Sequence, residues 1–355
     1  MTRGSTRRIN LGGVPIGGGA PVSVQTMGTR SPYDAAAILE QMNRAVAAGC
    51  DIFRLAVPDL KAVETLREVC RRKPLPVVAD VHFDYRIAVE AVNFGIDGLR
   101  INPGNIGGAD RVKAVVAAVR PKGLPIRIGV NGGSLEKDIL AKYGTATAEA
   151  LVESALRHVR LLEEQDYREI KISVKASDVP RTLAAYRLLS SRTDYPLHLG
   201  VTEAGTFLAG TVRSCVAMGA LLLEGIGDTI RVSLTDEPEQ EVKVGVELLC
   251  AAGLRQPRVH VTSCPTCGRT QADVIATARK VEEALENLYR ETPDAKRLHV
   301  AVMGCVVNGP GEAAGADLAL CGGKGTFALY EKGERIGAVP EGEAVAWILK
   351  KVREA

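Results

Sequence analysis

The sequence predicts an α/β protein, with an N-terminal (β/α)8 barrel of the TIM type and a smaller C-terminal α+β domain. Between residue 20 and about residue 250, eight short runs rich in Val, Ile and Leu alternate with longer amphipathic segments, as buried parallel strands alternate with helices. A turn with Gly, Asp and Arg at matching positions also repeats, at residues 49–55 and 95–101, and its core returns at 228–232. Eight such units match a closed barrel better than a doubly wound sheet.

The eight barrel strands are predicted from their apolar runs, in chain order. They are residues 22–27, 52–57, 77–81, 98–102, 126–130, 170–174, 197–201 and 229–234. The clearest of the intervening helices covers residues 33–48. Ser31 can cap its first turn, Pro32 suits the first helical position, and Gly49 suits the C-terminal cap.

The pattern changes after a plausible linker at residues 253–258. A short strand at 260–262 leads to Cys264, a long amphipathic helix covers about 270–289, and a strand at 298–303 leads to Cys305. Short strands follow at 317–320, 326–330 and 334–339, and a final helix is predicted at 343–352. We therefore expect two domains, residues 1–254 and 259–355, the second of a common domain size.

Composition excludes several classes of function. The net charge is only +3, from 45 basic and 42 acidic residues, and aromatic residues are 4% of the chain, so a nucleic-acid reader is disfavoured. No apolar run is long enough to span a bilayer. No apolar segment of the secretory type follows the N-terminal arginines. We therefore expect a cytoplasmic protein with reduced thiols, and neither a nucleic-acid nor a membrane partner.

The predicted strands carry cations where apolar residues are expected, namely Arg54, Arg100, Arg127, Lys171 and Arg231, and Lys175 follows the sixth strand. Side chains at the C-terminal ends of barrel strands converge on one mouth, the usual active site of this fold. Several cations there would hold an anion such as phosphate or diphosphate. The alternative is that each cation pairs with an acidic residue for structure. Lys171 is the weakest candidate, since strand alternation allows it to point outward.

Other polar residues lie at the predicted strand ends: Asp80, His82, Asn102, Asn131, Glu203 and Ser233. Glu203 can serve as a general acid or base where the site raises its pKa, or it can pair with an Arg and only orient it. His82 is a second candidate proton donor, although a single His at a strand end is more often structural.

The second domain holds a Cys-x-x-Cys pair, Cys264 and Cys267, a distant Cys305, and Glu312 shortly after it. Three thiolates can hold an iron–sulfur cluster or a metal ion. A carboxylate as fourth ligand would leave one position exchangeable for substrate. Zinc bound by four thiolates, with Cys321 as the fourth, is the serious alternative, and the spacing leaves both open.

The motifs together resemble one family. They lie at residues 24–27, 53–58, 79–83, 100–105, 200–205, 263–270 and 304–312. The chain resembles, over essentially its whole length, the 4-hydroxy-3-methylbut-2-enyl diphosphate synthase family, in its shorter bacterial form. This family acts in the methylerythritol phosphate route to isoprenoids.

The resemblance implies a [4Fe-4S] cluster held by Cys264, Cys267, Cys305 and Glu312. It implies reductive ring opening and dehydration of 2-C-methyl-D-erythritol 2,4-cyclodiphosphate to the linear allylic diphosphate. The catalytic residues expected are Glu312, which the substrate would displace from the cluster, and Glu203 as proton donor, with His82 or water as the alternative donor. Electrons would come from flavodoxin or ferredoxin, and similar chains form head-to-tail homodimers. The residues expected to bind substrate are Arg54, Asp80, Arg100, Asn102, Arg127, Asn131, Lys175, Arg231 and Ser233.

Two other functions fit parts of the pattern. A phosphate-binding barrel enzyme of the pterin-synthase type, with a structural zinc domain, predicts four thiolate ligands including Cys321. It also predicts tolerance of Glu312→Ala. An electron carrier with an appended barrel predicts a cluster that is insensitive to substrate, and it leaves the barrel cations unexplained.

Overall fold

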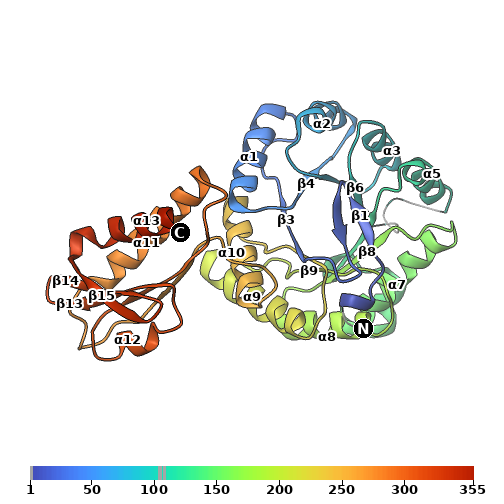
Figure 1. Cartoon of the computed structure of the whole chain (residues 1–355). Helices are drawn as coiled ribbons and strands as arrows, with labels where there is room; N and C mark the ends of the chain where they lie inside the picture. The colour runs from blue at the N-terminus through green and yellow to red at the C-terminus, as the bar shows by residue number, and fades with distance from the viewer. Residues whose placement is uncertain (1–2, 103–105, 107–108) are drawn as a thin grey trace. The chain divides into compact units, whose positions relative to one another are not determined.

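The structure is a computed structural model that describes residues 3–102, 106 and 109–355 (Figure 1). The chain divides into two compact units, Met1–Arg255 and Gln256–Ala355, and each unit is described by itself. No described helix is long and apolar enough to cross a membrane.

The first unit is a parallel barrel, as the sequence predicts. Its strands follow one another in the order β8-β7-β6-β5-β4-β3-β10-β9, and a parallel bridge between Ile172 and Leu197 links the first of these to the last. The strands are β3 (Ser23–Met27), β4 (Ile52–Ala56), β5 (Val77–Asp80), β6 (Gly98–Ile101), β7 (Ile126–Asn131), β8 (Ile170–Lys175), β9 (His198–Leu199) and β10 (Thr229–Ile230).

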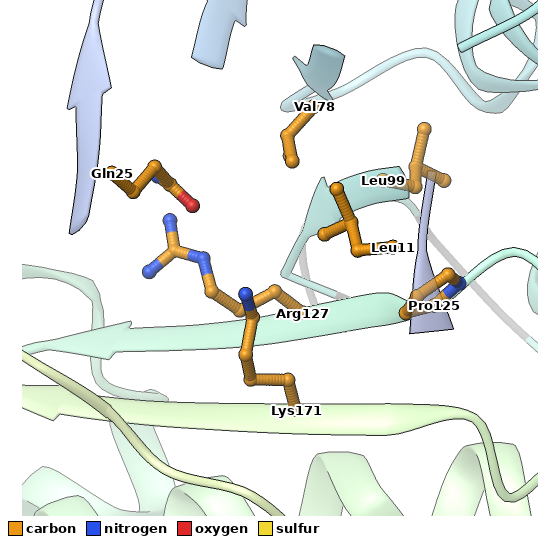
Figure 2. Close-up of a pocket in the computed structure, with 7 residues that line it drawn as sticks. All are labelled: Leu11, Gln25, Val78, Leu99, Pro125, Arg127 and Lys171. Carbon is orange, nitrogen blue, oxygen red and sulfur yellow. The ribbon is translucent and has the colours of Figure 1, made fainter. Parts of the chain in front are cut away.

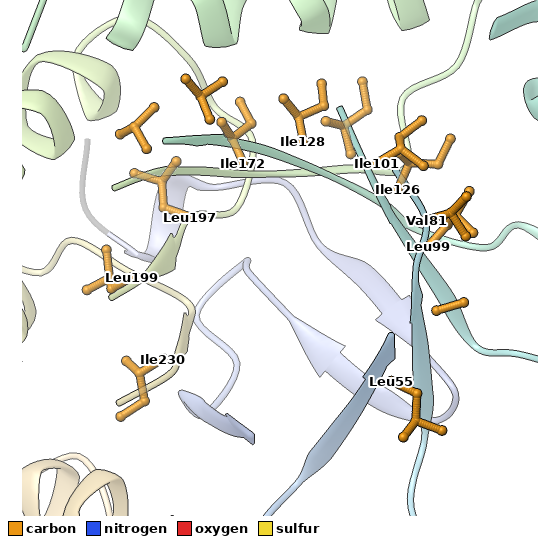
Figure 3. Packing of buried hydrophobic residues seen from close by; sticks show 14 of the residues in the cluster. Leu55, Val81, Leu99, Ile101, Ile126, Ile128, Ile172, Leu197, Leu199 and Ile230 are labelled. Carbon is orange, nitrogen blue, oxygen red and sulfur yellow. The ribbon is translucent and has the colours of Figure 1, made fainter. Parts of the chain in front are cut away.

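Helices surround the strands (Figure 1). They are α1 (Ala35–Ala48), α2 (Leu60–Arg72), α3 (Tyr85–Asn93), α5 (Ala109–Val119), α6 (Lys137–Tyr143), α7 (Ala148–Glu163), α8 (Val179–Ser190), α9 (Phe207–Leu223) and α10 (Pro238–Ala251). Short 3-10 turns occur at Arg3–Ser5, Arg120–Lys122 and Gly132–Ser134. The main apolar core lies between strands and helices, and Figure 3 shows Ile128, Ile172 and Ile230 on the outer side of their strands.

The start of α1 differs from the prediction. Its N-cap is Asp34 and not Ser31, because the Asp34 carboxylate accepts a hydrogen bond from the Ala37 N–H at 3.0 Å. Pro32 therefore lies before the helix. Gly49 ends the helix in the left-handed region, with φ at 102°, as predicted.

A hairpin that the sequence analysis did not predict packs against the N-terminal end of the barrel. It consists of β1 (Ile9–Leu11) and β2 (Val14–Ile16). Its buried side chains contact Ile52 and Val78, which lie early in their strands. Gly98 allows this approach, because a Cβ there would lie 3.1 Å from Leu11 Cδ1. The hairpin therefore fills the end of the barrel opposite to the mouth.

The repeated turn has a common structural role. In each copy an Asp carboxylate accepts the backbone N–H of a residue on a neighbouring strand, and the Asp N–H donates to the carbonyl of that same residue. The pairs are Asp51 with Val24, Asp97 with Val77, and Asp228 with Leu197, with carboxylate bonds of 2.7, 2.7 and 2.8 Å. Asp317 and His299 make the same pair of bonds in the second unit. The Asp thus fastens the turn before its strand to the adjacent strand.

The second unit is a five-stranded sheet in the order β11 (His260–Ser263), β12 (His299–Met303), β13 (Leu318–Gly323), β14 (Thr326–Glu331) and β15 (Glu334–Pro340). The first three strands are parallel and the last two pair antiparallel. Two helices, α11 (Val274–Glu291) and α13 (Ala344–Glu354), pack on one face. The short α12 (Gly309–Glu312) adjoins β13, and a 3-10 turn covers Glu341–Glu343. The predicted long helix begins at Val274 rather than near residue 270, because Asp273 caps it.

Candidate active site

The interior of the barrel is basic. Arg100, Arg127 and Lys171 are register partners across β6, β7 and β8, so their side chains point to the same side of the sheet. Lys171 is 1% exposed, and Figure 2 shows it beside Arg127, with the Gln25 amide beyond the Arg127 guanidinium. The expectation that Lys171 can point outward is wrong, because in β8 the apolar face meets the helices and the polar face turns inward.

Asp80 holds two of the arginines. Its Oδ2 lies 2.6 Å from Arg54 Nη2 and its Oδ1 lies 3.0 Å from Arg100 Nη1. Burial alone would raise the pKa of Asp80. Arg54, with His82 and Arg100, outweighs that effect and holds this pKa well below its ordinary value. Asp80 is therefore ionised and orients both guanidinium groups.

Arg231 forms an ion pair with a residue of the surrounding helices. Glu241, in the first turn of α10, accepts from Arg231 Nη2 at 3.0 Å and from Nε at 3.2 Å. Thr26 also donates to Glu241, at 2.8 Å. Arg54, Arg100 and Arg231 thus each pair with an acidic residue, which was the structural alternative to ligand binding.

Three interior cations form no ion pair with the carboxylates that the structure describes. Arg127 donates to Ser173 Oγ at 2.8 Å. Lys175 is 6% exposed, and burial, with Arg127 and Arg231 nearby, lowers its pKa well below the ordinary value. Lys171 Nζ is buried and has no hydrogen-bond partner among the described residues. Only three of the six interior basic residues are thus paired, with two carboxylates, Asp80 and Glu241, which leaves the interior suited to an anionic ligand.

Two glycines make room for the cations. A Cβ at Gly129 would lie 2.9 Å from Arg100 Nε, and a Cβ at Gly200 would overlap Lys175 Nζ. Any larger residue at position 129 or 200 must displace a cation.

The remaining predicted residues lie at or near the strand ends. Asn102 is buried just after β6, Asn131 ends β7, and Ser233 is half-buried beyond β10. Within the motif at 100–105, residues 103–105 lie outside the described residues. His82 Nε2 lies 3.0 Å from Arg100 Nη1, and its side chain is 47% exposed. His82 can therefore reach both a bound ligand and solvent.

Glu203 lies in the loop between β9 and α9, with its backbone in the left-handed region at φ 54°. This conformation costs a residue with a Cβ about 1–2 kcal/mol. Glu203 is exposed, and its carboxylate makes no hydrogen bond or ion pair within the described ranges. The expected alternative, in which Glu203 pairs with an Arg, is therefore not observed among the described residues.

The three thiols follow two neighbouring parallel strands. Cys264 comes directly after β11 and Cys305 follows β12, so their strands end at one edge of the sheet. Gly304 N–H donates to Cys264 Sγ at 3.2 Å. Backbone hydrogen bonds from Asn308 and Val307 lower the pKa of Cys305, which favours the thiolate that a metal needs.

The other two candidate ligands differ in their surroundings. Glu312 is exposed at the end of α12, whereas Cys321 is fully buried in β13. A Cβ at Gly309 would lie 3.1 Å from Cys321 Sγ, so Cys321 lies directly beneath the start of α12. Burial raises the pKa of Cys321 to about 11. This thiol packs as a small apolar residue.

The cysteines of the second unit are chemically suited to bind a metal ion or an iron–sulfur cluster. Cys264, Cys267, Cys305 and Cys321 are all free thiols, and three of them surround one sheet edge with a carboxylate nearby in sequence. Soft thiolates of this kind suit iron–sulfur clusters. Among the described residues, no three His, Cys, Asp or Glu side chains are gathered closely enough to hold a metal ion. The residue types thus suit an iron–sulfur cluster, but their side chains are not gathered into a binding site in this structure.

Sequence reasoning missed part of the barrel interior. Glu241, Gln25 and Ser173 were not singled out, although each lies buried at or near the cations. One pattern in the sequence indicated a polar face turned inward. Every second residue of β8 is polar, namely Lys171, Ser173 and Lys175. Nothing in the local sequence of α10 marks Glu241 as the partner of Arg231, which lies just after β10.

Comparisons with known proteins cover nearly the whole chain. The family model described as GcpE TIM-barrel domain matches residues 6–246, and the one described as GcpE protein C-terminal domain matches residues 260–354. A curated relative from Geobacter sulfurreducens is 55% identical over 352 residues, covering 99% of this chain and 98% of its own. One from Symbiobacterium thermophilum is 52% identical over 354 residues, covering 100% and 94%. Both are named 4-hydroxy-3-methylbut-2-en-1-yl diphosphate synthase (flavodoxin).

A solved structure of low sequence identity matches a large part of the chain. A truncated 3-deoxy-D-arabino-heptulosonate 7-phosphate synthase from Thermotoga maritima aligns with a TM-score of 0.50 at 14% identity, over 70% of this chain and 94% of its own. This likeness supports the barrel fold.

Proposed function

The chain belongs to the GcpE family, and on that premise we propose that it catalyses the reaction for which its curated relatives are named. In this reaction 2-C-methyl-D-erythritol 2,4-cyclodiphosphate takes up an electron pair, its ring opens, and a hydroxyl leaves as water. The product is (E)-4-hydroxy-3-methylbut-2-enyl diphosphate, an isoprenoid precursor. The observation that carries the proposal is the surplus of buried basic residues inside the barrel, in a chain similar over its full length to these enzymes.

We propose that the barrel binds the substrate through its diphosphate. Arg54 and Arg100, oriented by Asp80, and Arg231, oriented by Glu241, present guanidinium groups whose geometry suits phosphate oxygens. Arg127 pairs with no described carboxylate, and Lys175 adds an amine whose lowered pKa a bound anion would raise again. The neutral polar residues Asn102, Asn131 and Ser233 assist. Preformed ion pairs support this role, because they fix the donors before the ligand arrives.

We propose Glu203 as the proton donor to the leaving hydroxyl. Its exposed carboxylate on a strained backbone supports this choice, since such strain clusters at functional sites. His82, beside Arg100 and partly exposed, is the second candidate. It can protonate the departing oxygen or only fix Arg100.

We propose that Cys264, Cys267, Cys305 and Glu312 would hold a [4Fe-4S] cluster. The cluster would supply electrons to the substrate one at a time. The lowered pKa of Cys305 and the exposure of Cys267 support thiolate ligation. The exposed Glu312, a hard oxygen donor among soft ones, is the ligand most readily exchanged. Cys321 is fully buried in the cluster against which Cys264 packs, and its raised pKa disfavours the thiolate that a ligand needs.

We propose flavodoxin as the electron donor, as the names of the relatives indicate, with ferredoxin as the alternative. We further propose a homodimer, which the family resemblance supports, and a cytoplasmic location, where thiols of this kind stay reduced.

The test is anaerobic purification followed by iron, sulfide and zinc analysis of wild type, Glu312→Ala and Cys321→Ala, with turnover of the cyclodiphosphate measured in parallel. We expect about four irons and four sulfides per chain, lost or made labile in Glu312→Ala and kept in Cys321→Ala. One zinc per chain, lost with Cys321 and insensitive to Glu312, would reject the proposal in favour of a structural zinc unit.

A further inference from the structure

The loop that carries Glu203 is tied down on both sides of it. Thr202 N–H donates to the Ala176 carbonyl at 3.2 Å, and Thr235 N–H donates to the Gly205 carbonyl at 3.0 Å. These bonds fasten the loop to the segments that follow β8 and β10. Glu203 itself lies between the tied residues with its carboxylate exposed.

The peptide directly after Glu203 is held by a side chain from α9. Arg213 Nη1 donates to the Ala204 carbonyl at 2.8 Å. Ala204 is 1% exposed and packs against Ala217 of the same helix. Gly210 permits this close approach, because a Cβ there would lie 2.9 Å from the Gly205 carbonyl oxygen. Arg213 forms no ion pair with the residues that the structure describes, so its polar contact there is the bond to the loop.

We propose that Arg213 is a positioning residue for the reaction, which holds the Ala204 carbonyl so that the preceding Glu203 keeps its left-handed backbone and its carboxylate stays at the barrel mouth. The inference rests on the proposed function of Glu203. A residue with a Cβ relaxes to negative φ unless its surroundings prevent it. Such a relaxation rotates the Cα–Cβ bond, and with it the carboxylate, away from its present direction. In this role Arg213 acts through the loop.

The first test needs neither cluster nor substrate. Hydrogen–deuterium exchange of the amides in residues 201–206 is compared in wild type, Arg213→Met and Arg160→Met. Arg160 is a matched control, an exposed arginine in α7 whose side chain makes no hydrogen bond or ion pair with the described residues. We expect exchange in this loop to rise about tenfold in Arg213→Met, as for loss of one charge-assisted hydrogen bond, and to stay unchanged in Arg160→Met. Equal exchange in all three proteins would overturn the inference.

The second test is a double-mutant cycle in the cluster-loaded enzyme with Arg213→Met and Glu203→Gln. We expect Arg213→Met to lower kcat about tenfold with little change in KM in the wild-type background, and to have little effect where Glu203 is already Gln. Arg213→Lys, which keeps a donor, should recover part of the rate. The same loss in both backgrounds would overturn the inference, because Arg213 would then act independently of Glu203.

The two proposals fail in different ways. If the loaded wild type does not turn over the cyclodiphosphate, the proposed function fails. Two outcomes with an active wild type would reject the role of Arg213 and leave the proposed function intact. In the first, Glu203→Gln is as active as wild type. In the second, the effects of the Glu203 and Arg213 substitutions on kcat multiply.

Discussion

At the scale of single residues, Lys171 is the unusual feature of the barrel. A buried ammonium without a hydrogen-bond partner is costly, and Arg127 lies beside it. Burial first, and Arg127 second, lower the pKa of Lys171 from 10.5 to about 7. In the unfolded chain this lysine keeps its ordinary pKa. Between about pH 7 and pH 10.5 the unfolded chain therefore binds a proton that the folded chain does not.

We expect Lys171→Met to stabilise the barrel at pH 7, by about 1–4 kcal/mol. The wild-type free energy of unfolding should rise with pH between about 7 and 10.5, and the gain from the substitution should shrink over the same window. Urea unfolding at pH 7 and pH 10 measures both, with exposed Lys113→Met as control. A Lys171→Met protein less stable than wild type at pH 7 would show that the buried lysine contributes favourably.

At the scale of elements, each strand of the barrel has outward positions that face the helices and inward positions that face the barrel interior. Apolar residues on their outer faces pack against the helices. Inner positions carry polar and basic residues, as in β8, and two glycines leave space for them: Gly129 of β7 for Arg100, and Gly200 just after β9 for Lys175. The shape of the mouth thus depends on residues that have no side chain.

Gly200→Ala tests this dependence. The added Cβ overlaps Lys175 Nζ and would lie 2.8 Å from the Arg231 carbonyl, so the lysine must move. We expect KM for the cyclodiphosphate to rise about 10–100-fold, the equivalent of one or two charge-assisted hydrogen bonds, with a stability loss of about 1–3 kcal/mol. Gly133→Ala, where nothing lies within 4 Å of the added Cβ, is the control. An unchanged KM in Gly200→Ala would mean that Lys175 does not bind the substrate in its present position.

At the scale of the whole molecule, the chain consists of two units with separate apolar cores. The interior cations belong to the first unit and the candidate cluster ligands to the second. A ligand stabilises the unit that binds it, so each unit should respond to its own ligand.

We expect calorimetry to resolve two unfolding transitions. Inorganic pyrophosphate at about a hundred times its Kd should raise only the transition of the barrel, by roughly 5–10 °C. Loading with iron and sulfide should raise only the other transition, and Cys305→Ser should abolish that shift. A single transition that both ligands move together would show that the units unfold as one.

The sequence by itself determined the barrel, the second unit and most element positions, because apolar periodicity is a local property. It also marked the cations at the strands and the thiols, since charged residues in apolar runs and a Cys-x-x-Cys pair are visible without a fold. It placed the N-cap of α1 at Ser31 instead of Asp34, because several residues before a helix can cap it and only the backbone path selects one.

Only the tertiary structure decided which way the polar face of β8 points. Ile170, Ile172 and Val174 alternate with Lys171, Ser173 and Lys175, and all six are buried. Alternation shows that a strand has two different faces. In an open sheet the polar face meets solvent, whereas in a closed barrel the helices cover the outside and the polar face is enclosed. The bond from Thr26 to Glu241 and the hairpin at the end of the barrel depend on the same closure, because they join segments that only the folded barrel brings together.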